Sequence, residues 1–219
     1  FPSSGRQRSF FRRIKGFSES VSLPADRRFL DWVSIFQERQ RGELYREEFL
    51  AQLTSDPARF LRSAWQRART RDAVTCAGVA DMLTYLPCDI LTKVDIASMA
   101  HGLECRAPFL DYRVAEFAAS LPIRFKYRRG RKKWILREAF GHLLPREVFT
   151  RRKMGFGVPL DHWFRSELKD LTADLLLSPN ARCHAFLRPE AIQSLWDAHQ
   201  QKHYDHSARL WALVMLEEW

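Results

Sequence analysis

Residues 85–111 read YLPCDILTKVDIASMAHGLECRAPFLD, and this stretch decides the predicted fold. Apolar residues recur at helical spacing after Asp89, which predicts a helix capped by that residue. The helix is expected to end at His101-Gly102, because glycine permits a left-handed residue at a helix end. Pro87 is expected to stop the helix before it, and Ala107 is expected to be extended because it precedes a proline. The stretch therefore predicts two helices followed by an extended turn.

Besides the capping residue Asp89, five charged residues interrupt this mostly apolar stretch, at positions too regular for a random solvated face: Lys93, Asp95, Glu104, Arg106 and Asp111. Charges that are buried or half-buried need partners. Glu104 and Arg106 are separated by one residue in extended chain, so their side chains point the same way. We expect this pair to flank a cleft or to join a network with Asp95 and Asp111.

The composition predicts a soluble globular protein. The chain has 219 residues, is 46% hydrophobic, and carries 36 basic against 26 acidic side chains. It can therefore bury a core, and it contains no uninterrupted run of 18 apolar residues of the kind that marks a transmembrane helix. Four cysteines without a CxxC pair favour a reducing, cytoplasmic location. Phe1 is no start methionine and no signal core follows it, so the chain looks like an excised part of a longer protein.

The overall pattern predicts a mainly α fold. Leucine is common and glycine is limited to nine residues, which favours helices over a chain of short strands. A first helix is expected to end at Gly42, and the last two helices are expected at 191–199 and 207–218. We expect residues 1–25 to be a basic lead-in or linker and residues 26–219 to form one helical part. The segment Arg124–Lys133 has seven basic and no acidic residues, and it is expected to be solvated and extended.

With a second block of motifs, the sequence resembles the synthetase domain of glutamine-hydrolysing asparagine synthases. The second block comprises Lys133-Trp134-Ile135-Leu136-Arg137, Leu144-Pro145, Arg152-Lys153-Met154-Gly155-Phe156, Pro159 and Trp163. Both blocks occur in order and at compatible spacing, and weaker similarity extends from about Arg27 to Leu213. The resemblance implies the helical C-terminal portion of an α/β domain of the adenine-nucleotide alpha-hydrolase-like (ATP-pyrophosphatase) type.

The resemblance also implies a chemistry. In this family ATP activates the aspartate side chain as an acyl-adenylate and releases pyrophosphate, and ammonia from glutamine then displaces AMP. Such a site needs fixed cations and Mg²⁺ rather than a covalent nucleophile. The resemblance implies that Lys153 is catalytic, contacting the phosphates and the adenylate. It implies binding of ATP, pyrophosphate or substrate by Lys93, Arg106 and Gly155, a cleft-wall network of Asp95, Glu104 and Asp111, and no metal ligand.

The sequence departs from the family in ways that limit this function. It lacks the glycine-rich pyrophosphate loop, the acidic motif that supplies magnesium ligands, and the amino-terminal cysteine of the glutaminase half. Aspartate, ATP and ammonia are therefore expected to reach the site through a missing N-terminal part, and the isolated chain is expected to be inactive. Cys88 and Ile96 replace residues that are commonly aspartate and arginine in the family, which leaves the acceptor open.

Two alternatives remain at this point. A related adenylating amidotransferase with another acceptor, either beta-lactam-forming or polysaccharide-linked, would keep the same motifs. A non-catalytic helical domain would instead bind nucleic acid through Arg124–Lys133, where aromatic and basic residues interleave. We expect no membrane partner, disfavour nucleic acid because basic clusters are commonly solvated, and expect a homodimer as one form of the full-length protein. Without a covering sheet, the helices should expose an apolar face and self-associate.

Overall fold

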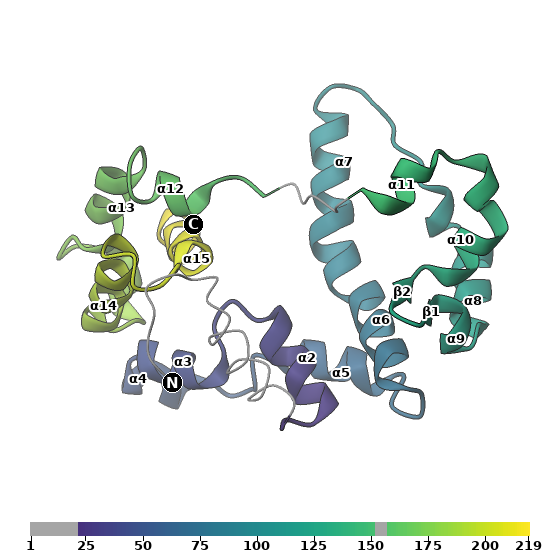
Figure 1. Ribbon diagram of the computed structural model, residues 1–219. Coiled ribbons are helices and arrows are strands. Elements are labelled where there is room, and N and C mark those ends of the chain that lie inside the picture. Colours follow the sequence, from purple (N-terminus) through teal and green to yellow (C-terminus); the bar gives the residue numbers. More distant parts are fainter. Residues whose placement is uncertain (1–21, 152–156) are drawn as a thin grey trace. The chain divides into compact units, whose positions relative to one another are not determined.

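The computed structural model describes residues 22–151 and 157–219, and these residues form a mostly helical protein (Figure 1). This confirms the predicted fold class. The described residues divide into two compact units, one formed by residues 22–57 and 157–219 and the other by residues 58–151. We call them unit 1 and unit 2, and each is described by itself.

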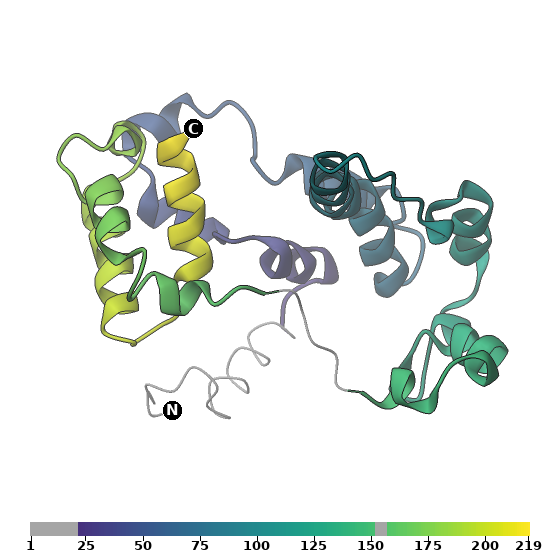
Figure 2. The ribbon, with the colours of Figure 1, turned by 90° about the horizontal axis from the view of Figure 1, so that it is seen from above.

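Unit 1 is built from short helices at both ends of its sequence. They are α2 (Ala25–Val33), α3 (Glu38–Leu44), α4 (Glu47–Gln52), α12 (Leu160–Trp163), α13 (Lys169–Leu176), η4 (Arg182–Ala185), α14 (Pro189–Gln200) and α15 (Ser207–Glu218). The helix α15 packs against α12, α13 and α14, as both ribbon views show (Figures 1 and 2). Phe164, Leu176, Ile192 and Leu210 are almost fully buried and form the centre of this packing. The two predicted terminal helices are confirmed.

An isolated β-bridge joins the two segments of unit 1. Tyr45 pairs with Leu187 in antiparallel fashion. The backbone N–H of Arg46 donates to the carbonyl of Phe186 at 3.0 Å, and that of Arg188 donates to the carbonyl of Leu44 at 2.8 Å. Because this pairing ends α3 at Leu44, Gly42 lies inside the helix, and the prediction that a helix ends at Gly42 is wrong.

A buried carboxylate fixes the last helix of unit 1. Glu217 is 7% exposed, and its two carboxylate oxygens accept the backbone N–H groups of Arg182 and Cys183, each at 2.8 Å. These two groups begin η4, where helical N–H donors have no partner within the helix. Glu217 therefore caps η4 from α15. The buried N–H groups stabilise the charged form, and they lower the pKa of Glu217 against the opposing effect of burial.

Unit 2 contains helices and one two-stranded sheet. Its elements are α5 (Arg59–Gln66), α6 (Ala73–Leu83), η1 (Leu86–Leu91), α7 (Thr92–Met99), η2 (Pro108–Leu110), α8 (Tyr112–Ser120), α9 (Ile123–Lys126), β1 (Tyr127–Arg128), β2 (Arg131–Lys132), α10 (Trp134–Phe140), η3 (Gly141–Leu143) and α11 (Arg146–Thr150). Its small core lies where α5 packs on α6, and it buries Ala64, Trp65, Cys76 and Ala80.

One long helix dominates unit 2, and it runs from Ala73 to Met99 through α6, η1 and α7 (Figure 1). Asp72 begins it by accepting the backbone N–H groups of Val74 and Thr75. The prediction that Pro87 stops this helix is wrong. Pro87 lies in the first turn of η1, a wider π-helical turn that accommodates the missing N–H and the ring.

The surface of this long helix is largely uncovered. By length and composition alone its 27 residues would suffice to cross a membrane, and 17% of its most apolar window is buried. Core helices of proteins that cross no membrane share that property. Most large apolar side chains on it are exposed, among them Val74, Met82 and Ile96.

Candidate functional site

The candidate site lies along α7 and the segment that follows it in unit 2. Lys93 is in the first turn of α7, and its Nζ lies 3.6 Å from the Asp89 carboxylate one turn earlier. Both side chains are about half exposed or more, at 61% and 48%. Asp89 therefore pairs with Lys93 along the helix, and it does not cap the helix as predicted. The ammonium points to solvent, where an anionic ligand can reach it.

Glu104 and Arg106 form the second charged pair. The chain leaves α7 through Gly102, which has the left-handed φ of 67° that glycine permits, and then becomes extended. Arg106 Nε donates to Glu104 Oε1 at 2.8 Å, and both side chains are exposed. The extended spacing thus does place the two side chains together, and it holds them at the surface.

Asp111 forms the third pair and begins α8. Its carboxylate accepts the backbone N–H of Arg113 at 2.9 Å, as predicted for a capping residue. The Arg113 guanidinium also donates to both carboxylate oxygens, at 3.0 and 2.7 Å. These hydrogen bonds from Arg113 lower the pKa of Asp111. Asp111 is therefore held by its own helix.

The charges consequently form separate local pairs rather than one network within the described residues. Asp95 is exposed on α7, and its backbone carbonyl accepts the Ser98 hydroxyl at 3.2 Å, while its carboxylate is in none of the ion pairs found among the described residues. Lys153 and Gly155 lie outside the described residues. Whether Lys153 faces Lys93 and Arg106 across one concavity stays a prediction.

The residues at this site do not fit a magnesium ion. Mg²⁺ takes oxygen ligands in octahedral geometry, commonly from one or two carboxylates together with substrate phosphates. Here the carboxylates of Asp89, Glu104 and Asp111 each face a cation of the chain. Across residues 22–151 and 157–219, no group of three His, Cys, Asp or Glu side chains is arranged to hold a metal.

An apolar groove lies beside the site in unit 2, and the sequence did not predict it. Its volume is about 560 Å³, and apolar side chains of α6, η1, η2 and α8 line it, including Val79, Leu86 and Phe109. Lys126 is the charged residue in its lining. Small residues at helical spacing on α8, namely Ala115, Ala118 and Ala119, were the available signal. The groove is part of the uncovered apolar surface that the sequence predicts.

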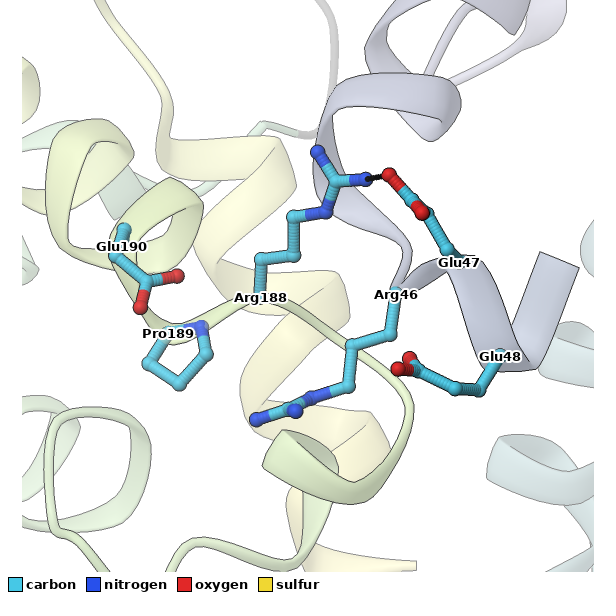
Figure 3. A pocket seen from close by; sticks show the side chains of 6 residues that line it. All are labelled: Arg46, Glu47, Glu48, Arg188, Pro189 and Glu190. Carbon is cyan, nitrogen blue, oxygen red and sulfur yellow. Dashed lines mark hydrogen bonds and ion pairs between the residues drawn. The ribbon is translucent and has the colours of Figure 1, made fainter.

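Unit 1 carries a smaller, charged pocket of about 220 Å³ (Figure 3). It lies where the first turns of α4 and α14 meet beside the β-bridge. Arg188 points to Glu47 and lies 3.5 Å from its carboxylate, and Arg46 Nε donates to the Leu187 carbonyl at 3.3 Å. Three carboxylates surround these two arginines, namely Glu47, Glu48 and Glu190. The pocket therefore joins the two segments of unit 1 and offers no excess positive charge to an anion.

Unit 1 also contains a buried histidine pair, His199 and His206, which sequence reasoning missed. His199 has no exposed area, and its Nδ1 accepts the backbone N–H of His206 at 3.1 Å. Arg165 donates to the His199 carbonyl at 2.9 Å. Burial, followed by the charge of Arg165, lowers the pKa of His199. This pair packs the core of unit 1.

The geometry defines a mostly helical chain that presents exposed cations in local ion pairs beside an uncovered apolar surface. The family model for asparagine synthase matches residues 1–219. The chain belongs to the asparagine synthase family.

Curated relatives agree with this assignment. The chain is 31% identical to asparagine synthetase [glutamine-hydrolyzing] 1 of Bacillus subtilis over 139 residues, which are 64% of this chain and 22% of that protein. It is 35% identical to the Gallus gallus asparagine synthetase over 128 residues, 53% of this chain and 22% of the relative. It is 38% identical to the Bos taurus asparagine synthetase over 84 residues, which are 35% of this chain and 15% of that protein. The chain thus spans at most about a fifth of the length of these relatives. No solved structure gave a significant match.

Proposed function

We propose that this chain is part of an ATP-dependent amidotransferase that adenylates aspartate and transfers glutamine-derived ammonia to give asparagine. The family match over residues 1–219 carries the proposal. The named relatives, which are glutamine-hydrolysing asparagine synthetases, support the reaction class. Because the chain spans a small part of their length, the glutaminase reaction and most nucleotide contacts belong to segments that the relatives carry beyond the matched region.

In this proposal the cations of the chain stabilise the phosphate charge that builds up during adenylation. Lys153, with Gly155 allowing close approach of the backbone, contacts the phosphates and the adenylate. Lys93 and Arg106 add binding contacts to ATP, pyrophosphate or aspartate. Glu104 orients Arg106, and Asp95 and Asp111 are proposed to shape the cleft wall.

The local ion pairs are compatible with such a role because a cation can exchange its carboxylate partner for a phosphate with little loss of free energy. Exposed ion pairs contribute on the order of 0–1 kcal/mol to stability, since water and salt screen them. Arg106 and Glu104 are 85% and 69% exposed, so the guanidinium can leave the carboxylate for a phosphate at small cost. Arginine also binds phosphate in a bidentate manner, which favours the exchange. The Glu104 carboxylate then keeps the free guanidinium close to its binding position between turnovers.

The remaining parts of the proposal concern the molecule's surroundings. ATP is the expected substrate, and Mg²⁺, when bound, would neutralise its phosphates through ligands outside the described residues. We propose a cytoplasmic location, small-molecule substrates and a homodimer for the full-length protein. The isolated chain is expected to be inactive because its sequence contains neither the glycine-rich pyrophosphate loop nor the acidic motif.

Ile96 favours a second candidate, an adenylating amidotransferase with a different acceptor. This residue is 65% exposed on α7, one turn after Lys93, where the family commonly has arginine. An exposed apolar residue cannot pair with a carboxylate of the acceptor. A beta-lactam precursor or a polysaccharide-linked acceptor would then replace aspartate, while ATP and pyrophosphate chemistry would remain.

Pyrophosphate release by the protein that carries this chain tests the proposal. We expect release that depends on aspartate and on glutamine or ammonia. Lys153→Ala should lower kcat strongly, whereas Arg39→Gln, which removes an exposed arginine paired with Glu43, should leave it unchanged. Release that is indifferent to aspartate but responds to another carboxylic acid would favour the second candidate. Absence of ATP cleavage with every acceptor would contradict both.

A further inference from the structure

The segment Arg124–Lys133 forms a structured surface that the proposed function does not use, and we call it the basic hairpin. The prediction of an extended segment is only partly right, because α9 ends at Lys126 and β1 then pairs with β2 in antiparallel register. In this register Arg128 lies directly opposite Arg131, and Tyr127 lies opposite Lys132. Like charges directly opposite one another destabilise a strand pair. The register therefore places two arginines opposite each other in the strand pair, which lowers its stability.

No carboxylate offsets this charge within the described residues. The seven cations of the hairpin are Arg124, Lys126, Arg128, Arg129, Arg131, Lys132 and Lys133, and none of them forms an ion pair there. All are exposed except Lys126, which is half-buried and donates to the Ala119 carbonyl at 3.4 Å. The hairpin is thus a concentrated positive surface without internal neutralisation.

Aromatic side chains interleave with these cations. The guanidinium of Arg124 lies 5.1 Å from the ring centroid of Phe125, and that of Arg128 lies 5.1 Å from the ring centroid of Trp134. Such cation–π contacts hold arginine side chains in place without neutralising them. Tyr127 is 48% exposed on the first strand, so part of its ring is open to a stacking partner.

The backbone conformation of the hairpin also lowers its stability. Arg129 and Lys133 have positive φ angles of 48° and 56°, a conformation that disfavours residues with a Cβ atom. Only Gly130, at 78°, adopts such an angle without penalty. Arg129 in the turn and Lys133 directly after β2 thus carry cationic side chains at two positions where glycine or asparagine would be more stable.

The sequence alone disfavours nucleic acid at this segment, but the structure orders the cations on a hairpin beside an exposed aromatic ring, and we therefore propose that the basic hairpin is a docking surface for single-stranded nucleic acid. The cations contact successive phosphates, and the Tyr127 ring stacks on a base, which is how sequence-tolerant single-strand binders combine charge and aromatic surface. An acidic polypeptide would satisfy the charges but has no base to occupy the exposed ring. This inference uses no residue of the candidate synthetase site, and its tests do not depend on the proposed function.

The first test is the salt dependence of binding, measured by fluorescence anisotropy with a labelled oligouridylate and the full chain. Affinity for single strands falls with a logarithmic slope of about 0.7 per neutralised phosphate. If four cations contact phosphates, affinity should fall by about 50-fold between about 50 and 200 mM salt. Binding that is absent at the lower salt concentration, or indifferent to salt, would overturn the proposal.

Charge-matched variants locate the surface. Arg128→Gln with Arg131→Gln should remove two contacts and reduce the fall over the same salt range to about sevenfold. Arg67→Gln with Arg69→Gln removes the same charge from exposed arginines elsewhere in unit 2, and it should leave the salt dependence unchanged. Equal effects of the two pairs would show nonspecific attraction to net charge and overturn the assignment.

Three further measurements separate the alternative explanations of such binding. Arg128→Lys with Arg131→Lys keeps the charge and should keep the salt slope, which shows that the glutamine pair acts through charge and not through misfolding. Tyr127→Leu should weaken binding by about tenfold with the slope unchanged, because stacking is not electrostatic. Poly-glutamate of equal charge should compete poorly with the oligouridylate. Equal competition, or an unchanged affinity of Tyr127→Leu, would reassign the surface to acidic polypeptides and contradict the proposal.

Discussion

His206 makes the stability of unit 1 dependent on pH. It is 9% exposed at the start of α15, and its Nδ1 lies 3.0 Å from Nη1 of Arg209 and accepts a hydrogen bond from it. Burial lowers the pKa of His206 from 6.5 to about 4, Arg209 and His199 act in the same direction, and Asp205 opposes them. The ring of Tyr204, with a centroid 4.7 Å away, completes its surroundings. The folded unit therefore favours the neutral form of the His206 imidazole.

The sign and size of the effect follow from this lowered pKa. An unfolded histidine takes up a proton as the pH falls through 6.5, whereas the folded one resists protonation until about 4. The stability is therefore fully present above the unfolded pKa and is lost as the pH falls. Between about pH 7.5 and pH 5 the loss from this one group is about 2 kcal/mol, which is about 30-fold in the unfolding equilibrium.

Hydrogen exchange of α14 and α15, corrected for the intrinsic pH dependence of exchange, measures this loss. His206→Gln should remove about 2 kcal/mol of the pH dependence, while a smaller part from His199, whose pKa is also lowered, should remain. His203→Gln is the matched control because His203 is exposed on the same segment. A pH dependence of His206→Gln equal to that of His203→Gln would refute the reasoning. Keeping the pH above about 5 excludes titration of Glu217, whose pKa lies below its ordinary value.

Three other predictions concern single groups. Glu217→Ala should destabilise unit 1 by about 2–4 kcal/mol in urea unfolding, because two backbone N–H groups lose their buried acceptor; a loss below about 1 kcal/mol would argue against the cap. Cys88 and Cys105 are exposed and should react quickly with a thiol reagent, whereas burial raises the pKa of Cys183 to about 12 and should keep it unreactive in the folded chain. Rapid labelling of Cys183 without denaturant would contradict this. Asp111→Ala should cost about 1 kcal/mol through the lost cap of α8, and Asp111→Asn should recover most of it, since asparagine is also a good cap.

Features set by neighbouring residues were predictable from the sequence. Asp111 caps α8, Gly102 takes the left-handed conformation, and α14 and α15 occupy the expected stretches, because each depends on local capping or spacing. The pairing of Glu104 with Arg106 likewise follows from extended spacing.

Features set by distant partners were not predictable in the same way. Gly42 lies inside α3 because the strand-like pairing of Tyr45 with Leu187, far away in sequence, sets the end of that helix. Pro87 is tolerated because the helix widens around it, which spacing alone does not reveal. The apolar groove is visible only once several helices are assembled, since each contributes a few side chains to it.

Tracing the oxygen atoms of the aspartate side chain tests most directly whether the protein that carries this chain adenylates aspartate. Aspartate labelled with ¹⁸O in its side-chain carboxylate is incubated with ATP, glutamine and the protein that carries this chain, and the nucleotide and phosphate products are examined by mass spectrometry. Adenylation makes a carboxylate oxygen attack the α-phosphorus, so displacement by ammonia leaves one ¹⁸O atom in AMP, with unlabelled pyrophosphate and labelled asparagine. Label in inorganic phosphate together with ADP, or AMP without label, would contradict adenylation of aspartate.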